Sequence, residues 1–194
     1  RALQIAGTGL QDLQDRVDTT AIKQADTIAA EDIANLLSGE GGYLHQVEGQ
    51  AVDGYAGFNE KLSEIQGRVS GHLTNDRQKA KFGEVMRARM ARASTKAAAH
   101  YEHQTRQQAY GASVGRYKLS ADAYLAATDP DERELEMGRM KDELSEQAEM
   151  LGWSADEAKA AEMEQMTAVH AGAIGALVSR GDAAGAREYF QGVE

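Results

Sequence analysis

Several residue types are missing or scarce in this chain. Cysteine is absent from the 194 residues, which excludes disulfides, thiolate nucleophiles and thiolate metal sites but leaves the cellular compartment open. There is one proline, aromatic residues make up only 6%, and β-branched residues are too scattered to favour a sheet. No apolar run approaches the roughly 20 residues that a transmembrane helix needs, and no signal-peptide pattern is present. These absences favour an all-α chain without a transmembrane segment.

Patterns that carry catalysis are also missing. The sequence has no P-loop, nucleophile elbow or HExxH motif. His100 and His103 share a helix face around Glu102, but the spacing places no third metal ligand, so we expect packing or solvent exposure instead. Carboxylates are abundant, yet those of the first helix, Asp18 among them, are expected on outer faces and none forms a distinct acid–base pair. We therefore predict no enzyme, metal or cofactor in this stretch.

The longest predicted element runs from residue 76 to about 127. It lies between a turn signal at Leu73-Thr74-Asn75 and the Asp129-Pro130 pair. Apolar and small residues recur inside it at steps of three and four, which is typical of a one-sided helix. Unbroken, this helix would be roughly 75 to 80 Å long. Two interior glycines, Gly111 and Gly115, could bend or split it, because each costs roughly 1 kcal/mol relative to alanine.

The same stretch carries most of the positive charge. Between Arg77 and Lys118 there are ten basic and two acidic residues, whereas residues 1–67 have a net charge of −7 and residues 119–194 of −11. A basic helix can bind a nucleic-acid backbone, or the acidic segments can fold back and neutralise it. The net charge of −10 favours neutralisation. As contact residues we select an apolar seam and three arginines: Phe82, Met86, Met90, Arg87, Arg89 and Arg92.

Turn and cap signals predict the remaining elements. The glycines of residues 38–42 end a first helix over residues 2–37. Its apolar positions are Leu3, Leu10, Leu13, Val17, Ile28, Ile33 and Leu36. Residues 43–73 predict a short helix, a bend near Gly49 and a helix from about residue 53. Beyond Asp129-Pro130 a helix ends at Gly152, and a capping box at residues 154–157 opens a helix through residue 178. This punctuation predicts two parts, residues 1–128 and 129–194.

The C-terminal residues 176–190 resemble a single tetratricopeptide hairpin, with small residues at the crossing, a Gly-Asp turn and an aromatic on the second helix. One such unit cannot bury its apolar face alone. It needs the preceding helix, a partner, or further sequence. Because the chain starts at Arg1 and its last helix has no clear end, we expect it to be a piece of a longer protein, in which a catalytic domain could lie elsewhere.

Two stretches carry a resemblance to a family. The first runs from Gly42-Tyr43-Leu44 through Gly49-Gln50-Ala51-Val52-Asp53 and Phe58-Asn59-Glu60-Lys61-Leu62 to Leu73-Thr74-Asn75-Asp76-Arg77-Gln78 with Phe82. The second is Val178-Ser179-Arg180-Gly181-Asp182-Ala183-Ala184-Gly185-Ala186-Arg187. Together they resemble large helical virion proteins of tailed bacteriophages, over about residues 40–190. The resemblance implies a structural or internal virion protein, some of which are ejected with the genome into the host envelope, and it supplies no catalytic residues.

The sequence thus predicts an all-α, elongated helical bundle on one long central helix. The predicted function is architectural: a virion protein, such as an internal or ejection component, that binds copies of itself or other virion proteins through helix faces and complementary charge. It would reside in the virion, and in the host envelope or periplasm after ejection. Two other hypotheses stay open, a cellular helical adaptor that binds peptides or proteins and a nucleic-acid-binding packaging protein.

Overall fold

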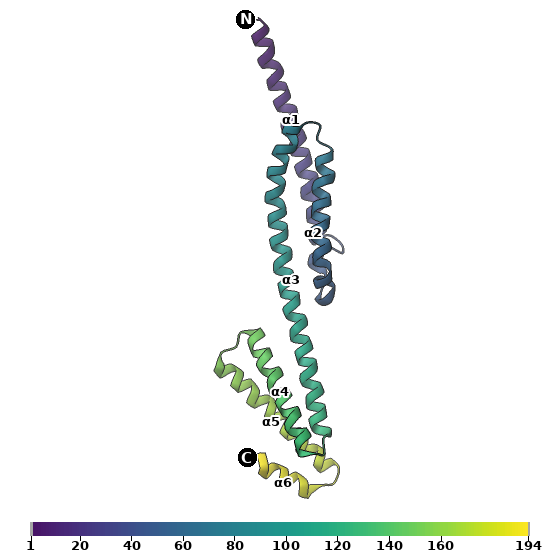
Figure 1. The fold of residues 1–194 in the computed structure, drawn as a ribbon, viewed down its shortest axis with the longest axis vertical. Coiled ribbons are helices and arrows are strands. Elements are labelled where there is room, and N and C mark those ends of the chain that lie inside the picture. The colour runs from purple at the N-terminus through teal and green to yellow at the C-terminus, as the bar shows by residue number, and fades with distance from the viewer. Residues whose placement is uncertain (1, 194) are drawn as a thin grey trace. The chain divides into compact units, whose positions relative to one another are not determined.

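The computed structural model describes residues 2–193, with the side chains of residues 11–192. Its elements are α1 (Ala2–Ser38), a short 3₁₀ helix η1 (Tyr43–His45), α2 (Glu48–Gly71), α3 (Asp76–Ala126), α4 (Pro130–Leu151), α5 (Ala155–Ser179) and α6 (Ala183–Val193) (Figure 1). Across these described residues there is no strand. The all-α prediction is confirmed.

The long central helix is also confirmed, ending one residue earlier than predicted. Helix α3 has 51 residues and continues through Gly111 and Gly115. Its start is fixed locally, because the Asn75 side-chain oxygen accepts a hydrogen bond from the backbone N–H of Gln78 at 2.8 Å, as an N-cap residue does. Two exposed glycines weaken a helix of this length without breaking it.

The chain forms two compact units, Arg1–Thr105 and Arg106–Glu194. The division lies inside α3, whereas the sequence punctuation suggested residues 128 and 129. The reason is that α3 contributes to two separate cores. Its first half packs with α1 and α2, and its second half packs with α4, α5 and α6, so the Asp129-Pro130 turn joins helices of the same unit.

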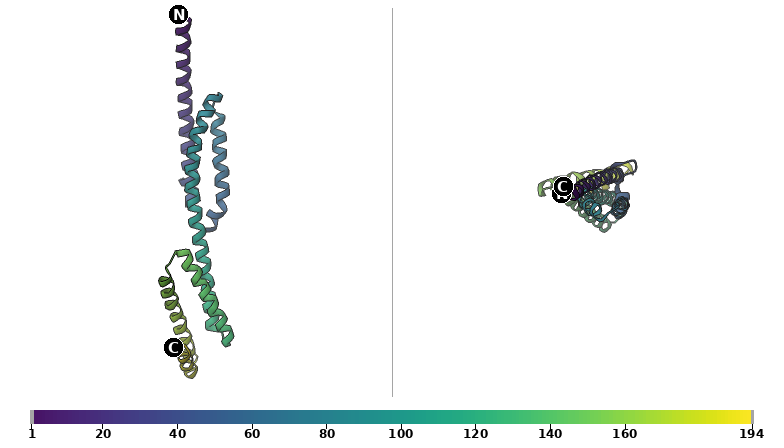
Figure 2. Two further views of the ribbon diagram at one scale, coloured as in Figure 1. Left: turned by 60° about the vertical axis from the view of Figure 1, so that its left-hand side comes forward. Right: turned by 90° about the horizontal axis from the view of Figure 1, so that it is seen from above.

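The first unit consists of α1, α2 and the first half of α3, which lie side by side in both views (Figures 1 and 2). Its core combines alanines with larger apolar residues of α1, η1, α2, the α2–α3 turn and α3: Ala25, Ala29, Ile33, Leu37, Tyr43, Phe58, Leu62, Ile65, Val69, Leu73, Phe82, Met86, Ala93 and Ala97. The alanines at Ala25, Ala29, Ala93 and Ala97 leave little volume between helices. Small residues of this kind let helix axes approach closely.

The start of α2 differs from the prediction. The predicted short helix is present as η1, and the helical conformation breaks at residues 46–47, two to three residues before the expected bend at Gly49. Helix α2 then begins at Glu48, which has φ +49°, whereas we expected a start near residue 53. The backbone N–H of Glu48 donates to Gln104 Oε1 of α3 at 2.7 Å, which satisfies a donor of the first turn. A contact with residues far along the chain therefore sets this boundary, and local spacing could not show it.

The start of α1 also differs in part. Leu3 and Leu10 of the predicted apolar face lie outside the described side chains. Leu13 and Val17 are 59% and 58% exposed, so they do not belong to the core. Figure 1 shows the first turns of α1 extending past the α2–α3 turn, so no helix of this unit covers them.

The second unit consists of the second half of α3 with α4, α5 and α6. Its core is formed by Tyr124, Met140, Leu144, Met166, Val169 and Ala173. The predicted punctuation is present: Gly152 has φ +68°, Ser154 and Glu157 form a capping box, and Asp182 Oδ1 accepts from the N–H of Gly185 at 2.8 Å. Gly181, at φ +81°, lets α6 turn back against α5 as the predicted helical hairpin.

Candidate interaction surface on helix α3

The three apolar residues selected from the sequence do line a seam, and it is internal. Phe82 and Met86 are 1% and 0% exposed, and the half-buried Met90 packs against the same cluster. All three contact the core shared by α1, α2 and α3. Phe82 and Met86 therefore stabilise the first unit and are unavailable to another molecule.

Of the three selected arginines, Arg89 is held within the chain. Its Nε and Nη2 donate to the two carboxylate oxygens of Asp26 on α1, at 2.5 and 2.7 Å. This two-pronged geometry matches a guanidinium to a carboxylate. Hydrogen bonding from Arg89 lowers the pKa of Asp26, and hydrogen bonding to Asp26 raises the pKa of Arg89. The pair fixes α1 against α3.

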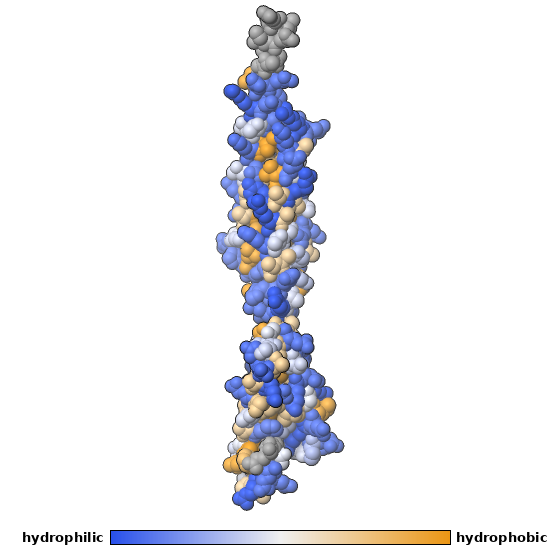
Figure 3. All heavy atoms as spheres, turned by 90° about the vertical axis from the view of Figure 1, so that its left-hand side faces the viewer, coloured by the Kyte–Doolittle hydropathy of each residue, from blue (hydrophilic) through white to orange (hydrophobic). Residues whose placement is uncertain are grey.

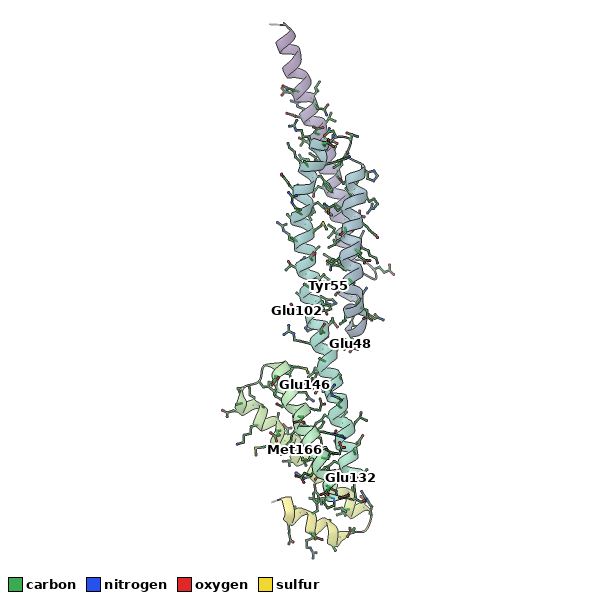
Figure 4. The ribbon with its side chains drawn as sticks, viewed as in Figure 1. Glu48, Tyr55, Glu102, Glu132, Glu146 and Met166 are labelled. Carbon is green, nitrogen blue, oxygen red and sulfur yellow. The ribbon has the colours of Figure 1, made fainter. Side chains whose placement is uncertain are left out.

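Two further arginines of α3 pair with acidic helices. In the first unit, Arg77 Nη1 donates to Asp15 Oδ1 of α1 at 2.5 Å. In the second, Arg116 donates to both Glu143 and Glu146 of α4, at 2.5 and 2.7 Å, and Figure 4 shows Glu146 on the side of α4 next to α3. Acidic segments on either side of α3 thus neutralise part of its charge.

Other cations of α3 stay open. Within the described residues no carboxylate lies within 4.0 Å of the charged ends of Lys79, Lys81, Arg87, Arg92, Lys96, Arg106 and Lys118. All seven are exposed. Arg92 and Lys96 are set apart from the others because both line one groove.

This groove, which we call the basic groove, lies between α1 and α3 and has a volume of about 250 Å³. One wall is formed by Ile33, Leu37 and neighbouring small residues of α1, and the other by Arg89, Arg92 and Lys96 of α3. Arg89 is neutralised by Asp26, whereas Arg92 and Lys96 are not. The groove therefore combines an apolar floor with a cationic edge.

One buried carboxylate was missed by the sequence reasoning. We expected Asp18 on the outside of the first helix, but it is only 4% exposed. Its Oδ1 accepts from the side-chain amides of Gln78 at 2.8 Å, Gln14 at 2.9 Å and Asn75 at 3.0 Å. Those hydrogen bonds, that of Gln78 first, lower the pKa of Asp18. A signal was present, since Asp18 lies seven residues before the buried Ala25 and so on the same helix face.

In the second unit a hydrogen-bonded aromatic cluster ties α3, α5 and α6 together. The Tyr189 hydroxyl bonds to the Tyr124 hydroxyl and to His170 Nδ1 at 2.7 Å, and Arg133 lies over the Tyr189 ring at 5.7 Å. Burial raises the pKa of Tyr189 and lowers that of His170. Both groups are therefore neutral at pH 7 and act as packing residues.

The remaining surface shows apolar side chains in small groups. Figure 3 shows short apolar patches separated by hydrophilic atoms on the face it presents. Exposed large residues include Leu13, Val17, Leu135, Trp153 and Met163. A second groove, of about 530 Å³ and lined by Leu144, Ala148 and Trp153 among others, lies between α4 and α5.

Among the described residues no group of three or more His, Asp or Glu side chains is arranged to hold a metal ion. His100 Nε2 donates to the backbone carbonyl oxygen of Gln46 at 2.8 Å, and His103 is exposed. Helices of sufficient length and apolarity to span a bilayer were not found in the described part of the chain. Comparisons with protein-family models, curated proteins and solved structures gave no match.

Proposed function

We propose that this chain is a structural virion protein of a tailed bacteriophage, acting through helix-face packing and charge complementarity and without catalysis. In this proposal it contacts copies of itself or neighbouring virion proteins. As an internal or ejection component, it would pass with the genome into the host envelope or periplasm. The class of protein is inferred from the resemblance of residues 42–82 and 178–187 to virion proteins of tailed bacteriophages.

The observation that carries the mechanism is the division of charge on α3. Arg77, Arg89 and Arg116 are paired with acidic residues of α1 and α4. Arg92 and Lys96 of the same helix have no such partner among the described residues and line the basic groove. Paired charges fix the helices within the chain, and open charges next to apolar surface suit protein–protein recognition. Such an arrangement fits an assembly component.

The test is the composition of the particle. Virions purified from the phage that carries this gene should contain the chain, as detected by mass spectrometry, at a fixed copy number per particle. After triggered ejection, an internal protein should leave the particle and appear in the host envelope fraction. Absence of the chain from purified virions would overturn the proposal.

A second candidate function, a cellular adaptor for peptides, is favoured by the groove between α4 and α5. Leu144, Ala148 and Trp153 give it an apolar lining, with Lys141 and Lys159 among its other residues. Grooves of this kind accept one face of an amphipathic helix. A pull-down from host lysate should then recover one protein. Its recovery should be lost with Trp153→Ala, which changes the groove, and kept with Leu13→Ala, which changes an exposed residue outside it. That result would support the adaptor over the virion protein.

The nucleic-acid hypothesis is tested in parallel. Duplex DNA titrated with the chain should bind with an affinity that falls steeply as salt rises if α3 contacts phosphates, with a slope set by the number of contacts. The net charge of −10 opposes such binding. If the chain does not bind DNA even at low salt, the nucleic-acid hypothesis is rejected and the virion-protein and adaptor functions remain.

A further inference from the structure

The apolar and cationic side chains that line the basic groove indicate the chemistry of a matching partner. Ile33 and Leu37 lie one turn apart on α1, with Arg92 and Lys96 one turn apart on the facing wall from α3. Neither cation has a carboxylate within 4.0 Å among the described residues. A matching partner is a helix that carries an apolar side chain with acidic residues along one side of it.

Helix α4 of the second unit presents that complementary pattern. Leu135 is 55% exposed, and Asp131, Glu134 and Asp142 are exposed around it. At about 100° per residue, these three carboxylates fall on the same side of Leu135. In the described part of the chain none of them pairs with a cation. We call Leu135 with these carboxylates the acidic face of α4.

We propose that the acidic face of α4 of one copy docks in the basic groove of a second copy. Leu135 would pack on the accessible Ala30 and Ala34 of α1, above the deeper lining of the groove, while Glu134 and Asp142 would pair with Arg92 and Lys96. This inference rests on the proposed function, in which copies of the chain bind one another. It specifies the two surfaces through which they bind.

The charge distribution supports this occupant over an unrelated one. Residues 106–194 hold 9 basic and 17 acidic side chains, a net charge of −8, whereas residues 1–105 hold 12 and 14, a net charge of −2. The acidic unit of one copy is therefore attracted to the groove of another and repelled by the acidic unit of another. Charge favours contact between unlike units.

A contact between two different surfaces has a consequence for assembly. After two copies have bound through one such contact, the pair still has one free groove and one free acidic face. Such a head-to-tail contact closes into a ring or grows into a filament, depending on the rotation between copies. Association should therefore proceed beyond a dimer.

The experiment compares charge-reversal variants of the full chain by sedimentation velocity at low salt. The groove variant is R92E/K96E, the face variant is E134K/D142K, and the control is K79E/R87E, which reverses two exposed cations outside the groove. We expect wild type and control to form assemblies that dissociate as salt is raised. Each of the other two variants should raise the concentration needed for assembly by roughly tenfold or more.

Mixing the two variants makes the test specific. The intact face of the groove variant fits the intact groove of the face variant, and the reversed groove and reversed face are also complementary in charge. An equimolar mixture should therefore assemble in alternation and regain the wild-type concentration dependence. The combined chain R92E/K96E/E134K/D142K should assemble again, because its charges are exchanged. Recovery by mixing also shows that each variant is folded.

Clear outcomes overturn the inference. A wild-type chain that stays monomeric at all concentrations and salts contradicts it, as do variants that assemble like wild type or a mixture that fails to associate. Self-association without presence in virions would keep this contact and reject the virion proposal. Presence in virions of a chain that is monomeric in solution would do the reverse.

Discussion

At the scale of single residues, the acidic side chains have two different roles. Asp18, Asp26 and Glu143 are tied to donors within the chain, and hydrogen bonds from those donors lower the pKa of each. Asp131 and Asp142 have no such donor side chain among the described residues and stay exposed. The first kind stabilises the fold, and the second is available for contacts with other molecules.

The pH dependence of stability should show the first kind. Because the folded-state pKa of Asp18 lies below its ordinary value of 3.8, the unfolded chain binds the proton more readily. The stabilisation by this carboxylate is complete above about pH 4 and is lost as the pH falls through the lowered pKa. Asp18→Asn should therefore unfold more easily than wild type at pH 7, with the difference shrinking towards pH 3.

Urea unfolding followed by circular dichroism at a series of pH values measures this effect. The control is Asp12→Asn, an exposed position on the same helix, which should follow the wild-type curve. A constant difference between wild type and Asp18→Asn across the pH range would contradict the assigned role.

The internal location of the seam leads to a second prediction at this scale. Met86 is 0% exposed, so Met86→Ala should leave a cavity and cost about 2–5 kcal/mol of unfolding free energy. Met163, 62% exposed, serves as the control, and Met163→Ala should change stability by less than about 0.5 kcal/mol. Chemical denaturation compares the two, and equal effects would argue against a packed core around Met86.

At the scale of elements, substituting alanine for each of two glycines of α4 and its C-terminus should change the stability in opposite directions. Gly152 ends α4 in the left-handed conformation, at φ +68°, so Gly152→Ala should destabilise by about 1–2 kcal/mol. Gly138 lies inside α4 with open space around its missing side chain, so Gly138→Ala should stabilise by about 0.5–1 kcal/mol. Thermal melting of both variants measures the signs, and a shared sign would contradict the helix boundary.

Local signals account for the elements that the sequence predicted well. Asp129-Pro130, Gly152 and the Ser154–Glu157 capping box act within a few residues of themselves, so their effect on α4 and α5 could be read directly. Long-range contacts decide what was missed. The start of α2 depends on Gln104, and the burial of Asp18 on Gln78, 60 residues away.

The same distinction holds for the candidate site. Helical spacing correctly grouped Phe82, Met86 and Met90 on one face, but it could not show that α1 and α2 cover that face. Nor could it show which cations have partners. Arg89 has one and Arg92 has none within the described residues, although the two lie only three residues apart. Availability for binding depends on the facing helix, which spacing on α3 does not specify.

At the scale of the whole molecule, one helix contributes to two cores. Met86 and Ala97 of α3 belong to the first core, and Tyr124 to the second. Between them every side chain of residues 105–112 is exposed. Backbone hydrogen bonds alone hold this segment helical, and an isolated helical stretch of such length is only marginally stable in water. The cores should therefore unfold as separate cooperative units.

A proline in the exposed segment tests this independence. Ala109→Pro removes a backbone hydrogen bond and introduces a clash, at a cost of about 3 kcal/mol or more inside a helix, but it displaces no buried side chain. Hydrogen exchange measured by mass spectrometry should show faster exchange near residues 105–112 and unchanged protection around Met86 and Met140. The matched variant Ala97→Pro, at a 0% exposed position, should remove protection throughout the first unit and leave the second intact. Loss of protection in both cores on Ala109→Pro would instead mean that α3 transmits cooperativity along its length, because only a continuous helix could then couple residues that share no core.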